Sequence, residues 1–338
     1  MTQVIVGGIE GGGTHSTLVL LDESGKEVCR VTGPDTNHWT IGMSECQKRI
    51  ADMVRRAKEQ AAIPTSEPLY ALGLCLSGCE QEESNAKLWQ GLKESYPHVS
   101  ERYTVSSDTD GSVATVAPNG GMVLISGTGS NCLLINPDGG RYQCGGWGWM
   151  LGDEGSAWWI SLKAIKTIFD DHDGLIKSNY CTDWVWEAIR DHFQIDTRPA
   201  LLDHCYTSFE KHKFAGLCRK LAQGALEGDE LCKQLFITAG EVLAATVLAQ
   251  VPRASAELIT KPGGLQVLCV GSVWKSWDLL KPGFVPRLQQ DSSLEELSLT
   301  RLTTTTAMGA AYLAAERCNV TIPKTYRENY QVFYHYKR

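Results

Sequence analysis

The 338-residue sequence lacks the features that mark membrane and secreted proteins. No apolar run approaches the roughly 18 residues needed to cross a bilayer, and the N-terminus has neither the basic segment nor the apolar core of a signal peptide. The 12 cysteines form no CxxC pair and show no spacing to histidine typical of a zinc site. We therefore expect a reduced, cytoplasmic protein without a membrane span.

Positive charge and the common nucleotide-binding motifs are also scarce. The chain has 32 Lys and Arg against 39 Asp and Glu, a net charge of −7. General binding to nucleic acid requires a basic face, so we do not expect it here. The dinucleotide fingerprint GxGxxG and the P-loop GxxxxGK[ST] are both missing. These absences disfavour a dehydrogenase and a P-loop enzyme.

The chain instead contains one pattern twice. Residues 122–135 consist of an apolar run, a glycine- and hydroxyl-rich loop (SGTGS) and a second apolar run, and residues 4–21 repeat this order around the loop EGGGT. Alternate glycines let backbone N–H groups turn toward one point, which suits a phosphate. One such loop alone is compatible with an ordinary tight turn. Two copies about a hundred residues apart suggest two loops that grip a nucleotide triphosphate from opposite sides.

Strands and helices alternate along the chain, which favours an α/β layer architecture. We expect helices at residues 44–62 and 80–95 and buried strands at 69–76 and 102–107. The length suggests two domains. The run PNGG at residues 118–121 is a candidate junction between them.

Two aspartates are candidates for chemistry, and each has a structural alternative. Asp108 follows a predicted strand, so it is either a general base or the N-cap of the next helix. Asp153 lies in the glycine-rich run CGGWGWMLGDEGS. It either binds a polyhydroxylated ligand or favours the start of the helix expected near Ser156. Trp147 in the same run is a candidate to line a site.

Eight short motifs, taken in order, carry a resemblance to a known family. They are residues 10–14 (EGGGT), 36–39 (TNHW), 76–78 (LSG), 107–108 (SD), 125–131 (ISGTGSN), 144–148 (CGGWG), 152–156 (GDEGS) and 269–274 (CVGSVW). Together they closely resemble the animal N-acetylglucosamine kinases, within the sugar kinase/heat-shock protein 70/actin superfamily. The resemblance covers nearly the whole chain except residues 169–204 and the last dozen or so.

The resemblance implies two ribonuclease-H-like (actin-like ATPase) domains with an interdomain cleft. The first would comprise residues 1–118, joined by the tail from about residue 320, and the second residues 119–319. The implied activity is phosphorylation of the 6-hydroxyl of N-acetyl-D-glucosamine in amino-sugar salvage, with ATP and Mg²⁺. The resemblance also implies a homodimer. Its binding partners would be ATP and a small sugar, and neither nucleic acid nor a membrane.

The resemblance implies a role for each matching residue. It places ATP against Gly12, Gly13, Thr14, Gly127, Thr128, Gly216, Gly271 and Ser272. It places the sugar against Asn37, Ser77, Asp108, Asn131, Gly146, Trp147, Gly148 and Asp153. Asp108 would be the catalytic base, and Glu10 would reach Mg²⁺ through water. Glu10 stands where most of the superfamily has aspartate, so its charge lies one methylene further from the backbone.

Several alternatives remain open on sequence alone. The acceptor sugar could instead be N-acetylmannosamine, glucose or a muramyl compound, including a muramyl dipeptide. The chain could also be a non-kinase actin-like ATPase module that changes shape on binding ATP. A third reading is an activator ATPase serving the iron–sulfur cluster of a partner, although the sequence offers no close cysteine pair beyond Cys75 and Cys79.

Overall fold

The computed structural model describes residues 4–12 and 15–338. The chain divides into two compact units. Unit 1 comprises Met1–Gly120 and Thr300–Val332, and unit 2 comprises Gly121–Leu299 and Phe333–Arg338.

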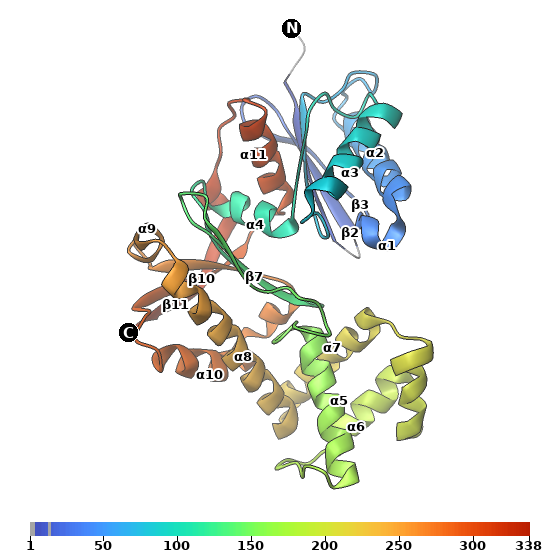
Figure 1. Cartoon of the computed structure of the whole chain (residues 1–338), viewed down its shortest axis with the longest axis vertical. Coiled ribbons are helices and arrows are strands. Elements are labelled where there is room, and N and C mark those ends of the chain that lie inside the picture. Colours follow the sequence, from blue (N-terminus) through green and yellow to red (C-terminus); the bar gives the residue numbers. More distant parts are fainter. Residues whose placement is uncertain (1–3, 13–14) are drawn as a thin grey trace. The chain divides into compact units, whose positions relative to one another are not determined.

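Unit 1 is a mixed five-stranded sheet with helices on both faces (Figure 1). Its elements are β1 (Val6–Gly11), β2 (His15–Leu21), β3 (Glu27–Pro34), α1 (His38–Ile41), α2 (Met43–Gln60), β4 (Ala71–Leu76), α3 (Glu82–Ser95), β5 (Tyr103–Ser106), α4 (Asp108–Val116), α11 (Ala307–Arg317) and η5 (Tyr326–Asn329). The strand order is β3-β2-β1-β4-β5. The pairs β1–β2 and β2–β3 are antiparallel, whereas β4 is parallel to both β1 and β5.

The two faces of this sheet belong to different hydrophobic clusters because side chains alternate along a strand. On β2, Leu18 and Leu20 point toward α2 and α3, whereas Val19 and Leu21 point toward α11. Glycine brings α11 close to the sheet: a Cβ added at Gly8 would lie 2.1 Å from the carbonyl oxygen of Ala307. The small residues of α11 are therefore matched to glycines on the strands below.

Unit 2 is built around a six-stranded sheet. Its elements are β6 (Gly121–Ser126), β7 (Ser130–Ile135), β8 (Arg141–Gly145), α5 (Ala157–Asp173), α6 (Asp183–Phe193), η1 (Arg198–Ala200), η2 (Asp203–Thr207), α7 (Lys211–Glu227), α8 (Glu230–Gln250), η3 (Val251–Arg253), α9 (Ala256–Ile259), β9 (Leu265–Val270), η4 (Ser272–Ser276), α10 (Trp277–Gln289), β10 (Glu296–Leu302) and β11 (Tyr330–Lys337). The last residues of β10 and the first residues of β11 are counted with unit 1. The strand order is β11-β10-β9-β6-β7-β8.

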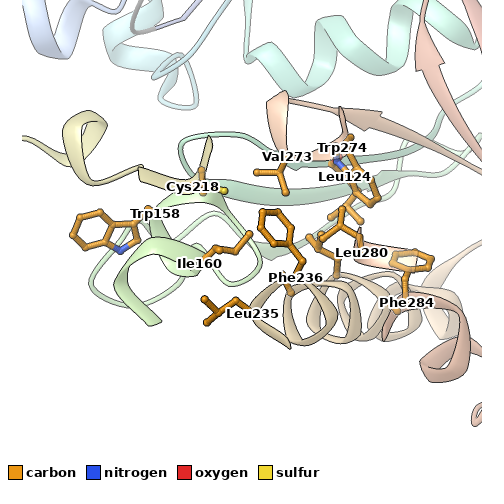
Figure 2. Close-up of a cluster of buried hydrophobic side chains, with 14 of the residues drawn as sticks. Leu124, Trp158, Ile160, Cys218, Leu235, Phe236, Val273, Trp274, Leu280 and Phe284 are labelled. Atoms are coloured by element: carbon orange, nitrogen blue, oxygen red, sulfur yellow. The ribbon is translucent and has the colours of Figure 1, made fainter. Parts of the chain in front are cut away.

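One large hydrophobic cluster holds unit 2 together. Its side chains come from the sheet and from α5, α6, α7, α8 and α10. Figure 2 shows part of it, including Leu124 of β6, Ile160 of α5, Phe236 of α8 and Leu280 of α10, all fully buried. Complete burial of side chains this large contributes about 1.5–3 kcal/mol each. Helices α5, α8 and α10 are therefore joined to the sheet by one hydrophobic core.

The two sheets repeat one topology. Each begins with an antiparallel meander of three strands, β1-β2-β3 or β6-β7-β8, and the first strand of each meander then pairs in parallel with a later strand, β4 or β9. The predicted repeat of strand, glycine loop and strand lies in the first two strands of each meander. We did not predict the third strands, β3 and β8, because they are half-exposed edge strands without a continuous apolar run.

The predicted domain limits need correction at the C-terminal side. We expected residues 119–319 in one domain, but α11 belongs to unit 1 because it packs on β1 and β4. The tail, which we expected to join the first domain from about residue 320, lies in unit 1 as far as Val332, and only its last residues, Phe333–Arg338, belong to unit 2. At the other limit, the first unit ends at Gly120.

One helical segment of the described chain, Glu230–Arg253, is long and apolar enough to cross a membrane by length and composition alone. More than half of it is buried inside the protein. Core helices of globular proteins meet the same criterion.

Candidate functional site

The carboxyl ends of three parallel strands of unit 1 bring several predicted site residues together. Gly11 of β1 lies opposite Leu76 of β4, and β5 ends beside β4. The residues that follow these strands therefore meet at one edge of the sheet, where ligands commonly bind in open α/β sheets. The Ser77 N–H donates to the carbonyl oxygen of Gly11 over 2.8 Å. This bond joins the first glycine loop to the loop that follows β4.

Asp108 lies at this edge as the first residue of α4. The N-cap of α4 is Ser107, which forms a reciprocal capping box with Asp110, so Asp108 is not needed to cap the helix. Its Oδ2 instead accepts a hydrogen bond of 2.5 Å from the Ser77 hydroxyl. Burial raises the pKa of Asp108, while the Ser77 hydrogen bond acts in the opposite direction. Asp108 is thus a carboxylate made more basic by its surroundings.

Asn37 and Trp39 extend the same edge. Asn37 caps α1, and the Trp39 indole N–H donates to the carbonyl oxygen of Gly78 over 2.9 Å. Gly78 has a φ of 91°, and a Cβ there would lie 3.2 Å from the Asn37 side-chain oxygen and closer still to Trp39. The Trp39 ring is 61% exposed. Asn37, Ser77 and Asp108 therefore form one polar group beside an exposed aromatic ring.

The predicted metal residue, Glu10, is held at the start of α11. Its Oε2 accepts the Thr306 backbone N–H over 3.0 Å and also the Thr306 hydroxyl. Within the described residues, no group of three or more His, Cys, Asp or Glu could hold a metal ion by itself. Mg²⁺ commonly keeps most of its water and needs only one or two carboxylates plus substrate phosphates. A single carboxylate near a phosphate loop fits that mode of binding.

The first glycine loop is only partly described. Gly12 donates its N–H to the carbonyl oxygen of His15 over 3.2 Å, and a Cβ added at Gly12 would lie 3.9 Å from the Ser77 hydroxyl. Gly12 therefore lies beside the polar group just described. The other two residues assigned to this loop, Gly13 and Thr14, lie outside the described residues.

The second glycine loop, residues 126–130, lies at the start of α5 in unit 2. The carbonyl oxygens of Gly127 and Thr128 accept the N–H groups of Ala157 and Trp158, the first two residues of that helix. Among the described residues, the N–H groups of Thr128 and Gly129 have no acceptor. Backbone donors without acceptors in a glycine loop suit an anion such as a phosphate.

Gly271 and Ser272, which follow β9, lie next to this loop. A Cβ at Gly271 would be 2.3 Å from the carbonyl oxygen of Ser126 and 2.8 Å from the Gly127 nitrogen. Gly271 also has a φ of 110°, which strongly favours glycine. Close packing and backbone conformation therefore both call for glycine here.

A second loop of unit 2 lies beside Asn131. A Cβ at Gly146 would be 2.7 Å from the Asn131 side-chain oxygen, and Gly148 accepts the Leu151 N–H through its carbonyl oxygen. Trp147 between the two glycines is 70% exposed. The loop thus presents a large aromatic surface next to a carboxamide, as suits a site-lining role.

Asp153, predicted to bind a polyhydroxylated ligand, is a buried residue with partners inside the protein. Its residue is only 3% exposed, with a φ of 65° that is uncommon outside glycine. One carboxylate oxygen accepts the Ser130 N–H over 2.9 Å, and the other lies 2.6 Å from the Lys211 ammonium group. Ser156, not Asp153, is the N-cap of α5. Lys211, at the start of α7, was missed because nothing in the local sequence links it to Asp153.

Gly216 lies inside α7. A Cβ at Gly216 would be 3.2 Å from Cε1 of His192, whose Nε2 forms a hydrogen bond of 2.7 Å with the carbonyl oxygen of Lys213. Burial lowers the pKa of His192, so its ring favours the neutral form. The structure thus places the His192 ring against Gly216, the residue that the resemblance assigns to the nucleoside.

Comparison with known protein families matches residues 8–285, most of the chain, to one of them. The chain belongs to the BadF/BadG/BcrA/BcrD ATPase family. Its relatives include an N-acetyl-D-glucosamine kinase from Dictyostelium discoideum, 27% identical over 258 residues that cover 72% of this chain and 78% of that protein. An N-acetylmuramic acid/N-acetylglucosamine kinase from Clostridium acetobutylicum is 26% identical over 266 residues, covering 76% of this chain and 84% of that protein.

Solved structures show that this ATPase has the fold of sugar kinases. A candidate N-acetylglucosamine kinase from Chromobacterium violaceum matches with a TM-score of 0.72 at 23% identity, covering 92% of this chain and 98% of the other. A ROK-family glucokinase from Streptomyces griseus, solved with glucose and AMPPNP, matches with a TM-score of 0.55 at 12% identity, covering 92% and 99%. The predicted actin-like ATPase fold is thereby confirmed.

Proposed function

We propose that this ATPase transfers the γ-phosphoryl group of ATP to the 6-hydroxyl of N-acetyl-D-glucosamine, giving N-acetylglucosamine 6-phosphate and ADP. The observation that carries the proposal is the polar group of unit 1, in which Asp108, bonded to Ser77, lies in the same cluster as Asn37 and next to the first glycine loop. An ATPase that only changes shape has no need of a basic carboxylate there. The names of the two relatives above support an amino sugar as the acceptor.

Phosphoryl transfer requires neutralised phosphate charge, in-line positioning and a group that accepts the hydroxyl proton. We assign the phosphates to Gly12, Gly13 and Thr14 and to Gly127 and Thr128; in the second loop the N–H groups of Thr128 and Gly129 are free, whereas that of Gly127 bonds to the Gly129 carbonyl oxygen. When bound, Mg²⁺ would neutralise charge on the phosphates, with Glu10 held toward it by Thr306. We assign the nucleoside to Gly216, Gly271 and Ser272.

Asp108 is the proposed proton acceptor. Its raised pKa increases its affinity for the 6-hydroxyl proton. The Ser77 hydroxyl fixes one carboxylate oxygen, so the other remains for the sugar. General-base assistance of this kind contributes about 10²–10⁴ in rate.

The remaining sugar contacts are proposed for each unit by itself. Asn37 offers a carboxamide in unit 1, and Asn131, Gly146, Trp147 and Gly148 form the loop surface of unit 2. The Trp147 ring suits the apolar face of the sugar or its acetyl methyl group.

Asp153 would also bind the sugar on this proposal. A carboxylate has about four acceptor sites, and one on each oxygen is occupied, by the Ser130 N–H and by the Lys211 ammonium group, so a sugar hydroxyl can bind beside these partners. The test of this contact is therefore whether sugar binding changes the environment of Lys211.

We further propose a cytoplasmic homodimer. All 12 cysteines are free, which agrees with a reducing compartment. The oligomeric state is checked by sedimentation of the purified protein at several concentrations, where a monomer at every concentration would contradict the dimer.

The decisive experiment is a coupled assay of ADP release with N-acetylglucosamine, N-acetylmannosamine, glucose and N-acetylmuramic acid. We expect release to depend on sugar, to be fastest with N-acetylglucosamine, and to yield a product phosphorylated on the 6-hydroxyl. Release that ignores sugar would favour the actin-like ATPase module. Preference for N-acetylmuramic acid would favour the second candidate function, a kinase for muramyl sugars, which the name of the Clostridium relative supports.

The base is tested by Asp108→Asn. This substitution keeps the side-chain shape but removes the basic oxygen, so we expect turnover to fall by about 10²–10⁴ while ATP affinity and folding are retained. Turnover and ATP affinity are measured on the same preparation. Nearly unchanged turnover would show that the base is another carboxylate, with Asp110 or Asp153 next to be tested.

A further inference from the structure

Hydrogen bonds, rather than packed side chains, fix the conformation of the second glycine loop. Gly127 and Gly129 have no side chains to pack, and their backbone has a wide conformational range. Two carbonyl oxygens of the loop bond to the start of α5, the Gly127 N–H bonds to the Gly129 carbonyl oxygen, and the Ser130 hydroxyl donates to the carbonyl oxygen of Glu154 over 2.8 Å. The Ser130 N–H is fixed by one group only, the Asp153 carboxylate, 2.9 Å away.

Asp153 in turn depends on Lys211. It is a nearly fully buried carboxylate at a left-handed backbone position, and its main-chain carbonyl accepts the Ser156 N–H over 3.1 Å. Burying a carboxylate is unfavourable unless it is paired and hydrogen-bonded. Lys211 provides that pairing: its ammonium group lies 2.6 Å from a carboxylate oxygen of Asp153, although the two residues are 58 positions apart in the sequence.

The position of Lys211 is not explained by the stability of its own helix. It is the first residue of α7, where a cation is disfavoured by the helix dipole. The helix also lacks acidic residues in its first turn. The contact with Asp153 is the feature of the structure that accounts for a lysine at this position.

We propose that Lys211 is a positioning residue for the glycine loop of residues 126–130, acting through Asp153. Lys211 holds one carboxylate oxygen, so the other stays directed at the Ser130 N–H, and the free N–H groups of Thr128 and Gly129 keep their direction. This inference rests on the proposed assignment of the loop to the phosphates of ATP. It names a residue that takes part without touching the nucleotide.

The test compares nucleotides with and without phosphates. In Lys211→Met the carboxylate loses its cation and the loop loses its anchor. Dissociation constants are measured by calorimetry without sugar. We expect those for ATP and ADP to rise about tenfold or more, which is the scale of losing a hydrogen bond to a charged group. The dissociation constant for adenosine should stay unchanged. Lys211→Arg keeps the cation and should restore most of the affinity. If the methionine variant is insoluble, Lys211→Gln replaces it.

The matched control is Lys220→Met. Lys220 lies on the same helix and pairs with Asp191, a carboxylate on the protein surface. Exposed pairs contribute little to stability, so none of the three dissociation constants should change. A change as large as that in Lys211→Met would show that the effect is general to lysines of α7 and would overturn the proposal.

A double-mutant cycle tests whether Lys211 acts through Asp153. In an Asp153→Asn background the buried charge is absent, so adding Lys211→Met should have no further effect on ATP affinity. Additive losses would mean that Lys211 contacts the phosphates directly. Equal losses for ATP and adenosine would mean a general structural role, and either result overturns the proposal. If the wild-type protein binds ATP but phosphorylates no sugar, the proposed function fails while these binding results still decide the role of Lys211.

Discussion

The hydrogen bond from Ser77 to Asp108 predicts a specific change in pH dependence. Burial raises the pKa of Asp108, and this 2.5 Å bond opposes the increase by stabilising the carboxylate. In Ser77→Ala the opposing contribution is lost, so the pKa of Asp108 rises further. A hydrogen bond to a charged group contributes about 1.5–3 kcal/mol, and we take the lower end because Asp108 is only partly buried. Since about 1.4 kcal/mol corresponds to one pH unit, the acidic limb should move up by about one unit.

The sign follows from the form that reacts. A general base works as the carboxylate, so activity is present above its pKa and is lost as the pH falls through it. The measurement is kcat/KM for the sugar across the acid-to-neutral range at saturating ATP, which reports the ionisation of the protein without bound sugar. Ser77→Ala should therefore lose a larger share of its activity at the acidic end of the range than at the neutral end.

The control for this prediction is Ser112→Ala. The Ser112 hydroxyl bonds to the main-chain carbonyl oxygen of Asp108 over 2.8 Å and leaves its carboxylate untouched. Its acidic limb should stay at the wild-type position. If Ser77→Ala instead lowers activity equally at every pH, Ser77 acts on sugar binding alone, and the argument from the hydrogen bond is refuted.

Three other substitutions test separate contacts. Thr306→Val removes a hydroxyl from Glu10, so we expect a higher Mg²⁺ concentration for half-maximal activity and weaker Mn²⁺ binding by electron paramagnetic resonance. Wild-type values for both would contradict the role of Thr306. Lys58 is 1% exposed, and burial lowers its pKa to about 8. Between pH 8 and about 10.4, Lys58 is therefore protonated in the unfolded chain but not in the folded one, so the free energy of unfolding should rise with pH. Denaturant unfolding should show this rise in the wild type relative to Lys58→Met, and the same pH dependence in both proteins would contradict it. Gly8→Ala places a Cβ against the backbone of α11 and should cost about 1–3 kcal/mol of unfolding free energy, whereas an unchanged midpoint would show that α11 shifts freely.

The sequence was informative wherever a contact is local. The buried strands were visible as apolar runs, and the glycine loops followed directly from their own residues. Asp108 was recognisable because it follows a strand, although its structural alternative was removed only when Ser107 proved to be the helix cap. The half-exposed strands β3 and β8 were missed because their side chains lack a continuous apolar pattern.

The sequence by itself therefore determined the repeated loop motif, the α/β class and, through the order of its motifs, the family resemblance. Only the tertiary structure decided the partners of Glu10 and Asp153, because these partners come from distant segments. Glu10 bonds to Thr306, 296 residues away, and Asp153 pairs with Lys211 on another helix. The physical reason is that packing of the helices against the sheets sets these distances, and no local period or spacing records which charged side chain arrives beside which carboxylate.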